Sequence, residues 1–136
     1  MYQCILEVPT HRKGLHPITT LIERELGVHL PKTGILNVFI THTSASLLIQ
    51  ENADPTARED LEEFLERTAP EGQGWHRHTL EGPDDTTSHL KSAITQTSLL
   101  VPIREGRLGL GTWQGIYLWE HRKSPHRRRL ILTLLP

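Results

Sequence analysis

Hydrophobic and polar positions change their spacing along the chain, and each change predicts a different element. From Ile35 to Thr43 the period is two, which places Leu36, Val38, Ile40 and His42 on one face of a strand. From Pro17 the spacing is helical, with Ile18, Leu21, Ile22 and Leu26 on one face and Gly27 at the end. The pattern predicts a mixture of helices and strands.

A second helix is predicted after Asp54, which supplies an N-cap carboxylate in front of Pro55 at the first helical position. It should run to about Arg67 and face the core with Ala57, Leu61, Phe64 and Leu65. A short third helix is expected from near Thr87, with Leu90, Ala93 and Ile94 facing inward. Strands are expected at residues 3–8, 98–103, 108–122 and 130–135, with a turn at residues 104–107.

Length and composition narrow the class of protein. A chain of 136 residues fits one domain, residues 1–136, that buries a core without disulfides. The single cysteine excludes a disulfide framework and a multi-cysteine metal cage. The net charge of -1 gives no general attraction to nucleic acid or to anionic membranes. No signal peptide or long apolar run is present, so the default expectation is a soluble cytoplasmic protein without membrane contact.

The first group of candidate site residues joins two histidines, His78 and His89, with acidic residues between them at Glu81, Asp84 and Asp85. Imidazole and carboxylate groups are suitable ligands for zinc or another divalent ion, and His42 could supply a third imidazole. The alternative is that these residues belong to a loop and to the cap of the third helix. Spacing alone leaves both interpretations open.

The second group lies between residues 41 and 54. Small hydroxyls at Thr43, Ser44 and Ser46 near a strand end suit an anion such as phosphate, and Glu51 could act as a base or bind a cation. Ser44 and Ser46 are equally well interpreted as structural residues. No serine here has the paired histidine and aspartate of a covalent nucleophile, so covalent serine catalysis is disfavoured.

Two further windows carry glycines and basic residues. Three glycines at residues 109–115 lie within a strand-like stretch and predict a bulge that faces a ligand, whereas Trp113 and Trp119 fit a core or a subunit interface better. Residues 121–129 are basic and are expected to connect two strands of a hairpin. Their arginines either form a solvated loop or hold a phosphorylated ligand. Nucleic-acid binding is disfavoured because no motif that reads a groove accompanies the charge.

These windows carry a resemblance that spans nearly the whole chain in the right order. The matching segments are residues 42–47 (HTSASL), 51–55 (ENADP), 81–85 (EGPDD), 88–92 (SHLKS), 111–116 (GTWQGI) and 120–122 (EHR). The GTWQ and ENxDP motifs make the match specific. On these residues the chain is identified as a member of the YjbQ family.

The resemblance implies an α+β subunit whose antiparallel sheet forms a half-barrel with two or three helices, and three such subunits that assemble into a homotrimer. Family members are labelled as secondary thiamine-phosphate synthases, which join a hydroxymethylpyrimidine diphosphate to a thiazole phosphate and release pyrophosphate. Carried over by position, the resemblance implies a polar pocket made of His42, Glu51, Asn52, Asp54, His78, Asp85, His89, Thr112 and Gln114, with Arg128 near its mouth. Together with the residue chemistry, we expect metal ligands at His42, His78 and His89, catalytic roles for Glu51, Asp54, Asp85 and Gln114, and substrate contacts from Thr43, Ser44, Asn52, Thr112 and Arg128.

Two other classes of function fit the same residues. One is a trimer that binds a metal or a small phosphorylated metabolite without turnover. The other is a hydrolase that activates water at a divalent metal held by the three histidines. Formation of a product from purified substrates separates either enzyme from the binding protein, which would show only ligand-dependent thermal stabilisation.

Overall fold

The computed structural model describes all residues from Met1 to Pro136. None of its helices is long and apolar enough to cross a membrane. In chain order the elements are β1 (Tyr2–Thr10), β2 (Gly14–Pro17), α1 (Thr19–Leu26), the 3-10 turn η1 (Gly27–His29), β3 (Thr33–Ile40), β4 (Ala45–Glu51), α2 (Pro55–Thr68), α3 (Asp85–Ile94), β5 (Ser98–Arg104), β6 (Arg107–Leu108), β7 (Gln114–Glu120) and β8 (His126–Leu135).

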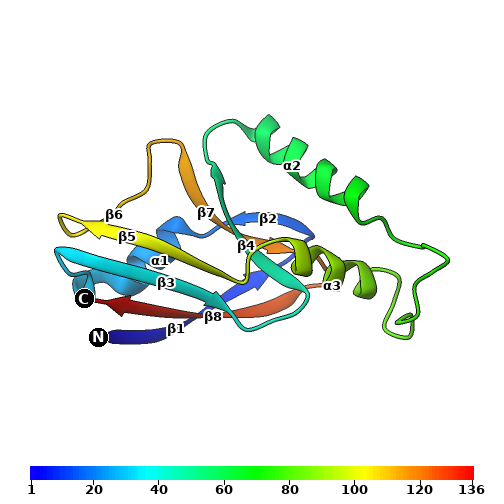
Figure 1. Cartoon of the computed structure of the whole chain (residues 1–136), viewed down its shortest axis with the longest axis horizontal. Coiled ribbons are helices and arrows are strands. Elements are labelled where there is room, and N and C mark those ends of the chain that lie inside the picture. The colour runs from blue at the N-terminus through cyan, green and yellow to red at the C-terminus, as the bar shows by residue number, and fades with distance from the viewer.

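The strands form two antiparallel sheets. The larger sheet has the order β1-β8-β3-β5-β6 and the smaller one the order β2-β7-β4. The larger sheet curls around the smaller one and α1, which gives the half-barrel that the resemblance implies (Figure 1). Register is set by apolar rows that face inward. Leu130 of β8, for example, lies between Leu6 of β1 and Ile40 of β3.

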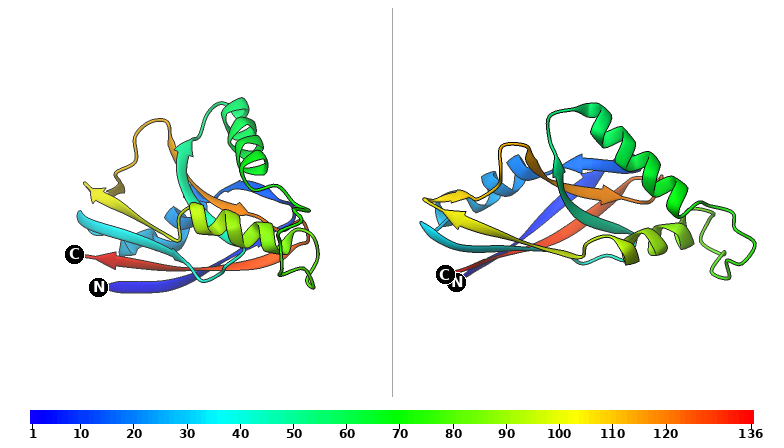
Figure 2. Two further views of the ribbon diagram at one scale, coloured as in Figure 1. Left: turned by 45° about the vertical axis from the view of Figure 1, so that its right-hand side comes forward. Right: turned by 45° about the horizontal axis from the view of Figure 1, so that its top comes forward.

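The main core fills the concave side of the larger sheet. The alternating residues Leu36, Val38 and Ile40 are fully buried there, as the period of two in β3 predicts. Helix α1 closes this core with Ile22 and Leu26, and it ends where Gly27 adopts a positive φ of 44°. The helix predicted from Pro17 is therefore confirmed, and so is the strand predicted at residues 35–43 except for its end, because β3 stops at Ile40 and leaves His42 outside the strand. The chain termini lie close together at one edge of the larger sheet (Figure 2).

The smaller sheet is buried on both faces at its central strand, β7. Ile116 and Leu118 point into the main core. Tyr117 and Trp119 point the other way and form a second cluster with Leu15 and with Leu65 of α2. Alternation along one strand therefore joins the half-barrel to the helix above it.

The strand predictions differ from the structure at three places. Strands β2 and β4 were not expected, because their polar side chains hide the buried Leu15, Ala45 and Leu47. The predicted strand 108–122 is interrupted by a loop at residues 109–113. The predicted hairpin around residues 121–129 is wrong, because β7 pairs with β2 and β4 whereas β8 pairs with β1 and β3. The basic residues from His126 to Arg129 belong to β8 itself.

Both later helices begin close to where the sequence predicts, but they bury different faces. Asp54 caps α2 by accepting a hydrogen bond from the Thr56 N–H, as expected. Of the predicted core stripe of α2 only Leu65 is buried, and Phe64 is 65% exposed. In α3 the buried residues are polar, and Ile94 is exposed. The inward faces of these two helices therefore make more polar contacts than apolar ones.

Candidate functional site

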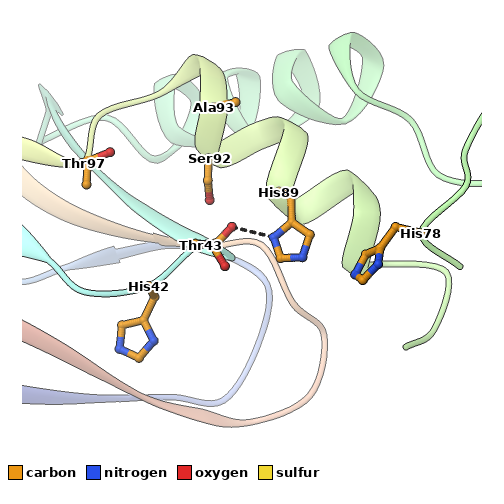
Figure 3. A pocket seen from close by; sticks show the side chains of 7 residues that line it. All are labelled: His42, Thr43, His78, His89, Ser92, Ala93 and Thr97. Carbon is orange, nitrogen blue, oxygen red and sulfur yellow. Dashed lines mark hydrogen bonds between the residues drawn. The ribbon is translucent and has the colours of Figure 1, made fainter. Parts of the chain in front are cut away.

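The site is built around the first turn of α3. Asp85 is the first residue of the helix and His89 follows four residues later, so both side chains lie on one helical face. His78 comes from the preceding loop, which folds back over this turn. Figure 3 shows the rings of His78 and His89 side by side at the pocket wall. A hydrogen bond from the Thr86 hydroxyl to the His78 carbonyl holds the loop in place.

One oxygen of Asp85 faces both imidazoles. Oδ2 lies 2.6 Å from Nε2 of His78 and 3.1 Å from Nε2 of His89. The three ligand atoms all lie within 4.8 Å of one another. Asp85 is almost fully buried, whereas both histidines reach the solvent. Two imidazoles and one carboxylate that converge in this way form a possible site for a divalent ion.

The tautomer of His89 tests whether these residues fit a cation. Its Nδ1 lies 2.9 Å from the Thr43 carbonyl, an acceptor, so Nδ1 must carry a hydrogen that it donates there. In the neutral ring Nε2 then presents a lone pair to the Asp85 carboxylate at 3.1 Å. Two lone pairs repel each other unless a positive charge lies between them. Either a second proton on His89 or a bound metal ion satisfies the pair, and a carbonyl partner on the remote nitrogen is typical of metal-binding histidines.

The charge of Asp85 is stabilised by its surroundings. Burial on its own raises the pKa of this carboxyl group, but contacts with Glu81, His78, His89 and Arg122 outweigh burial and lower it. Arg122 makes the closest cationic contact, with Nη1 donating to Oδ1 over 2.6 Å. Asp85 is therefore ionised at neutral pH, which a metal ligand requires.

The cluster opens into a pocket of about 630 Å³. Hydroxyl groups of Thr43, Ser92 and Thr97 line it beside the histidines. Sequence reasoning missed Ser92 and Thr97, although Ser92 follows His89 by three residues and the helical period places it on the same face. The volume suits a small metabolite. The lining offers neutral hydrogen-bond donors and imidazoles, and it contains no lysine or arginine.

His42 lines the same pocket but does not join the cluster of ligands. Its Nε2 accepts the Arg129 backbone N–H at 2.9 Å, and its Nδ1 lies 3.4 Å from Nη1 of Arg128. Burial, together with the charge of Arg128, lowers the pKa of His42, so the ring is neutral. Figure 3 shows it on the far side of Thr43 from His89. The third ligand position that the sequence assigned to His42 is taken in this geometry by Asp85.

The resemblance implies that Arg128 contacts a substrate at the mouth of the pocket. In the structure its side chain is buried and occupied by other partners. It is 3% exposed and pairs with the buried Glu120, through Nε to Oε1 at 2.7 Å and Nη2 to Oε2 at 2.5 Å. Nη2 also donates to the Ser44 carbonyl. Its guanidinium group therefore holds β7, β8 and the turn before β4 together.

Ser46 pairs with a histidine, although neither residue reaches the pocket. Its hydroxyl lies 2.9 Å from Nε2 of His121, and both residues are about 1% exposed. Burial, with smaller contributions from Lys91 and Arg128, lowers the pKa of His121 to about 3. The fold therefore encloses both side chains, and the pair lies outside the histidine pocket. Ser44 contributes only its backbone carbonyl to this region.

A second group of predicted site residues lies at the other end of β4. The β4–β7 ladder runs from Ala45 opposite Glu120 to Glu51 opposite Gln114, so roughly 20 Å of strand separates the two ends. The single chain therefore does not bring this second group to the histidine pocket. Its members are Glu51, Asn52, Asp54, Thr112 and Gln114.

Each member of this distant group has a structural contact. Glu51 accepts the backbone N–H groups of Ala53 and Asp54, and Asn52 donates to the carbonyls of Thr112 and Gln114. The Gln114 side chain accepts the Gly111 N–H. These bonds shape the loop before β7 and the start of α2. Catalytic or substrate-binding roles for these residues remain predictions.

Fold and site together define a class: a small α+β half-barrel with an open pocket lined by three histidines, two of which converge on a buried carboxylate. The chain belongs to the UPF0047 family, since the family profile described as "UPF0047 protein YjbQ-like" matches residues 5–136. It is 49% identical to UPF0047 protein sll1880 of Synechocystis over 96% of this chain and 89% of the relative. It is 45% identical to UPF0047 protein YjbQ of Salmonella typhimurium over 98% and 96% of the two chains.

Solved structures show the same fold. The conserved hypothetical protein TT1486 of Thermus thermophilus aligns with a TM-score of 0.86 at 40% identity, over 97% of this chain and 99% of that one. Hypothetical protein APE1520 of Aeropyrum pernix aligns with a TM-score of 0.88 at 30% identity, over 99% and 98%. These names state no activity, so the function must be argued from the site.

Proposed function

We propose that this protein is a metal-dependent enzyme that acts on a small phosphorylated metabolite in the pocket beside His78, Asp85 and His89. The observation that carries the proposal is the convergence of the Nε2 atoms of His78 and His89 on Oδ2 of Asp85, with Nδ1 of His89 committed to the Thr43 carbonyl. Three protein ligands leave positions open for water or substrate, as in catalytic zinc sites. Zinc is therefore the first candidate among divalent ions. The same set of two histidines and one carboxylate also suits iron(II), which is the second candidate.

The residues of the chain have separate tasks in this proposal. His78, His89 and Asp85 would hold the ion, which supplies a Lewis acid for phosphoryl oxygens and lowers the pKa of water. The hydroxyls of Thr43, Ser92 and Thr97 line the pocket and would donate to phosphate oxygens. Since no arginine is free in the lining, the ion is needed to balance the charge of a phosphorylated substrate.

The resemblance names the reaction to test first. It is the joining of hydroxymethylpyrimidine diphosphate to thiazole phosphate, where cationic groups would stabilise the leaving pyrophosphate. Hydrolysis of a phosphate ester is the second candidate, because the pocket is open to water and both histidines are partly exposed. A binding protein without turnover is the outcome if ligands raise the melting temperature and no product forms.

We further propose that the chain works as a homotrimer, as the resemblance implies. The convex face of the larger sheet is left uncovered by the helices (Figure 2). Ile5, Ile131 and Phe39 stand opposite one another across β1, β8 and β3 on that face. Leu100 of β5 adds to this apolar surface with 65% of its area exposed. Copies of the chain that pack these faces together would bury the surface.

Metal content per chain, measured on untagged protein, tests the proposed function. We expect about one divalent ion per parent chain and little in the variant His89→Ala, because losing a direct ligand costs more than the roughly 10–100-fold that outer contacts contribute. His11→Ala is the matched control, since His11 is exposed and lies outside the pocket. Product formation is then followed with the two thiamine precursors and with phosphate monoesters. Equal metal and equal turnover in the parent and His89→Ala would overturn the proposal.

A further inference from the structure

Three consecutive residues at the end of β7 each hold a different part of the molecule. Glu120 binds Arg128 of β8 and the Thr10 hydroxyl of β1. His121 pairs with Ser46 of β4. Arg122 binds Asp85 in the first turn of α3. The end of β7 therefore joins both sheets to the helix that carries the site.

Arg122 contacts every acidic residue around the start of α3. Nη1 donates to Oδ1 of Asp85 over 2.6 Å, Nε lies 3.3 Å from Oδ1 of Asp84, and Nη2 donates to the Glu81 carbonyl over 3.2 Å. Asp84 is fixed in turn by the Lys123 N–H at 2.8 Å. The backbone N–H of Arg122 donates to Glu120, which anchors the base of the side chain. Arg122 is thus held both at its backbone and at its guanidinium group.

This arrangement divides the two oxygens of Asp85 between different partners. Arg122 occupies Oδ1, and only Oδ2 faces the Nε2 atoms of His78 and His89. A carboxylate with two free oxygens can bind an ion through one or both of them. With Oδ1 occupied, one oxygen is available to the ion, and rotation of the carboxylate would break the bond to Arg122.

We propose that Arg122 is a positioning residue of the metal site. It holds Asp85 in the orientation in which Oδ2 faces the two imidazoles and Oδ1 is withheld from the ion. This inference rests on the proposed metal site and goes beyond it, because Arg122 makes no hydrogen bond to either histidine and does not line the pocket. Outer contacts of this kind orient ligands and tune the affinity of metal sites.

Cobalt(II) is the probe for this inference, because its visible absorption reports the number and arrangement of its ligands. Apoprotein is titrated with cobalt(II) for the parent, Arg122→Met and Arg122→Lys. We expect a roughly 10–100-fold rise in Kd for Arg122→Met together with a changed spectrum, as Asp85 becomes free to offer both oxygens. Arg122→Lys keeps the positive charge but not the forked geometry, so it should restore part of the affinity and not the parent spectrum. Arg127→Met is the control, because Arg127 is exposed and pairs only with Glu7.

The outcomes separate the two proposals. If the parent binds no cobalt(II), the proposed metal function fails. If the parent binds it and both Arg122 variants bind with the same Kd and the same spectrum, the metal site stands and the positioning role of Arg122 is overturned. Circular dichroism establishes that each variant is folded, and Arg122→Lys decides the question if Arg122→Met does not fold.

Discussion

At the scale of single residues, the site depends on which atom of each side chain is already occupied. Nδ1 of His89 is committed to a carbonyl, which leaves Nε2 for a cation. Nε2 of His42 accepts a backbone N–H, so this nitrogen is not available to bind a metal ion. The sequence shows two equivalent histidines at these positions. Their hydrogen bonds give them different roles.

The buried His121 leads to a prediction about pH. Its pKa is about 3 in the folded protein and about 6.5 when exposed, so the unfolded chain binds the proton first as pH falls. Stability linked to this residue is complete above about pH 6.5 and is lost toward pH 3, at about 1.4 kcal/mol per pH unit.

Urea unfolding of the parent and of His121→Gln between pH 4 and pH 6 measures this effect. The parent should lose about 2–3 kcal/mol more than the variant over that range, because glutamine does not titrate. His11→Gln serves as the control with an exposed histidine. The same pH slope in the parent and His121→Gln would contradict the assignment.

At the scale of elements, helices α2 and α3 are held together more by charge than by apolar packing. The Lys91 side chain of α3 is 1% exposed, and its ammonium lies 2.5 Å from Oε1 of Glu66 in α2. Lys13 approaches the same carboxylate oxygen at 3.1 Å. Burial lowers the pKa of Lys91, with Glu66 opposing that shift. The carboxylate therefore bridges two lysines that are separated in sequence.

The contact between Glu66 and Lys91 predicts that substitutions of the two residues change the free energy of unfolding by different amounts. Glu66→Gln removes the nearest counter-charge of the buried Lys91 ammonium and should cost about 2 kcal/mol of unfolding free energy, less than a fully buried pair because Glu66 is 42% exposed. Lys91→Met should change stability little, since Glu66 keeps Lys13 and partial solvent contact.

Chemical denaturation of the two variants tests this order. The control is Glu63→Gln, which removes an exposed pair with Arg67 on the same helix and should stay within about 0.5 kcal/mol of the parent. A larger loss for Lys91→Met than for Glu66→Gln would show that the ammonium is stabilised by other contacts.

At the scale of the whole molecule, the two faces of the larger sheet have different environments. The concave face is filled by the main core and α1. The convex face carries apolar side chains that alternate with the buried ones, including Ile5 and Phe39, which are 51% and 40% exposed. One sheet with two apolar faces suits a subunit of an oligomer.

Sedimentation analysis tests the proposed trimer on this face. The parent should sediment as a trimer, and Phe39→Glu should shift it toward monomer by placing a charge in the apolar row. Val28→Glu is the matched control, since Val28 is 96% exposed and lies in η1, outside the sheet. A monomeric parent, or a Phe39→Glu protein that remains trimeric, would exclude this face as the interface.

Local chemistry alone settled several parts of this structure. Alternation predicted the buried face of β3, Asp54 and Pro55 fixed the start of α2, and Gly27 marked the end of α1. These features need only neighbouring residues, so they can be seen in the sequence. The spacing of Asp85 and His89 by one helical turn was also visible, although it was not recognised as a ligand pair.

The tertiary structure decided what depends on residues far apart in the chain. The committed nitrogen of His89 depends on Thr43, the free oxygen of Asp85 depends on Arg122, and the burial of Arg128 depends on Glu120 and Ser44. The same holds for β7 and β8, which are adjacent in sequence but belong to different sheets. A sequence pattern reports the types of donors and acceptors, but only the fold determines which of them meet. The separation of the polar residues into a histidine pocket and a distant loop follows from the length of β4.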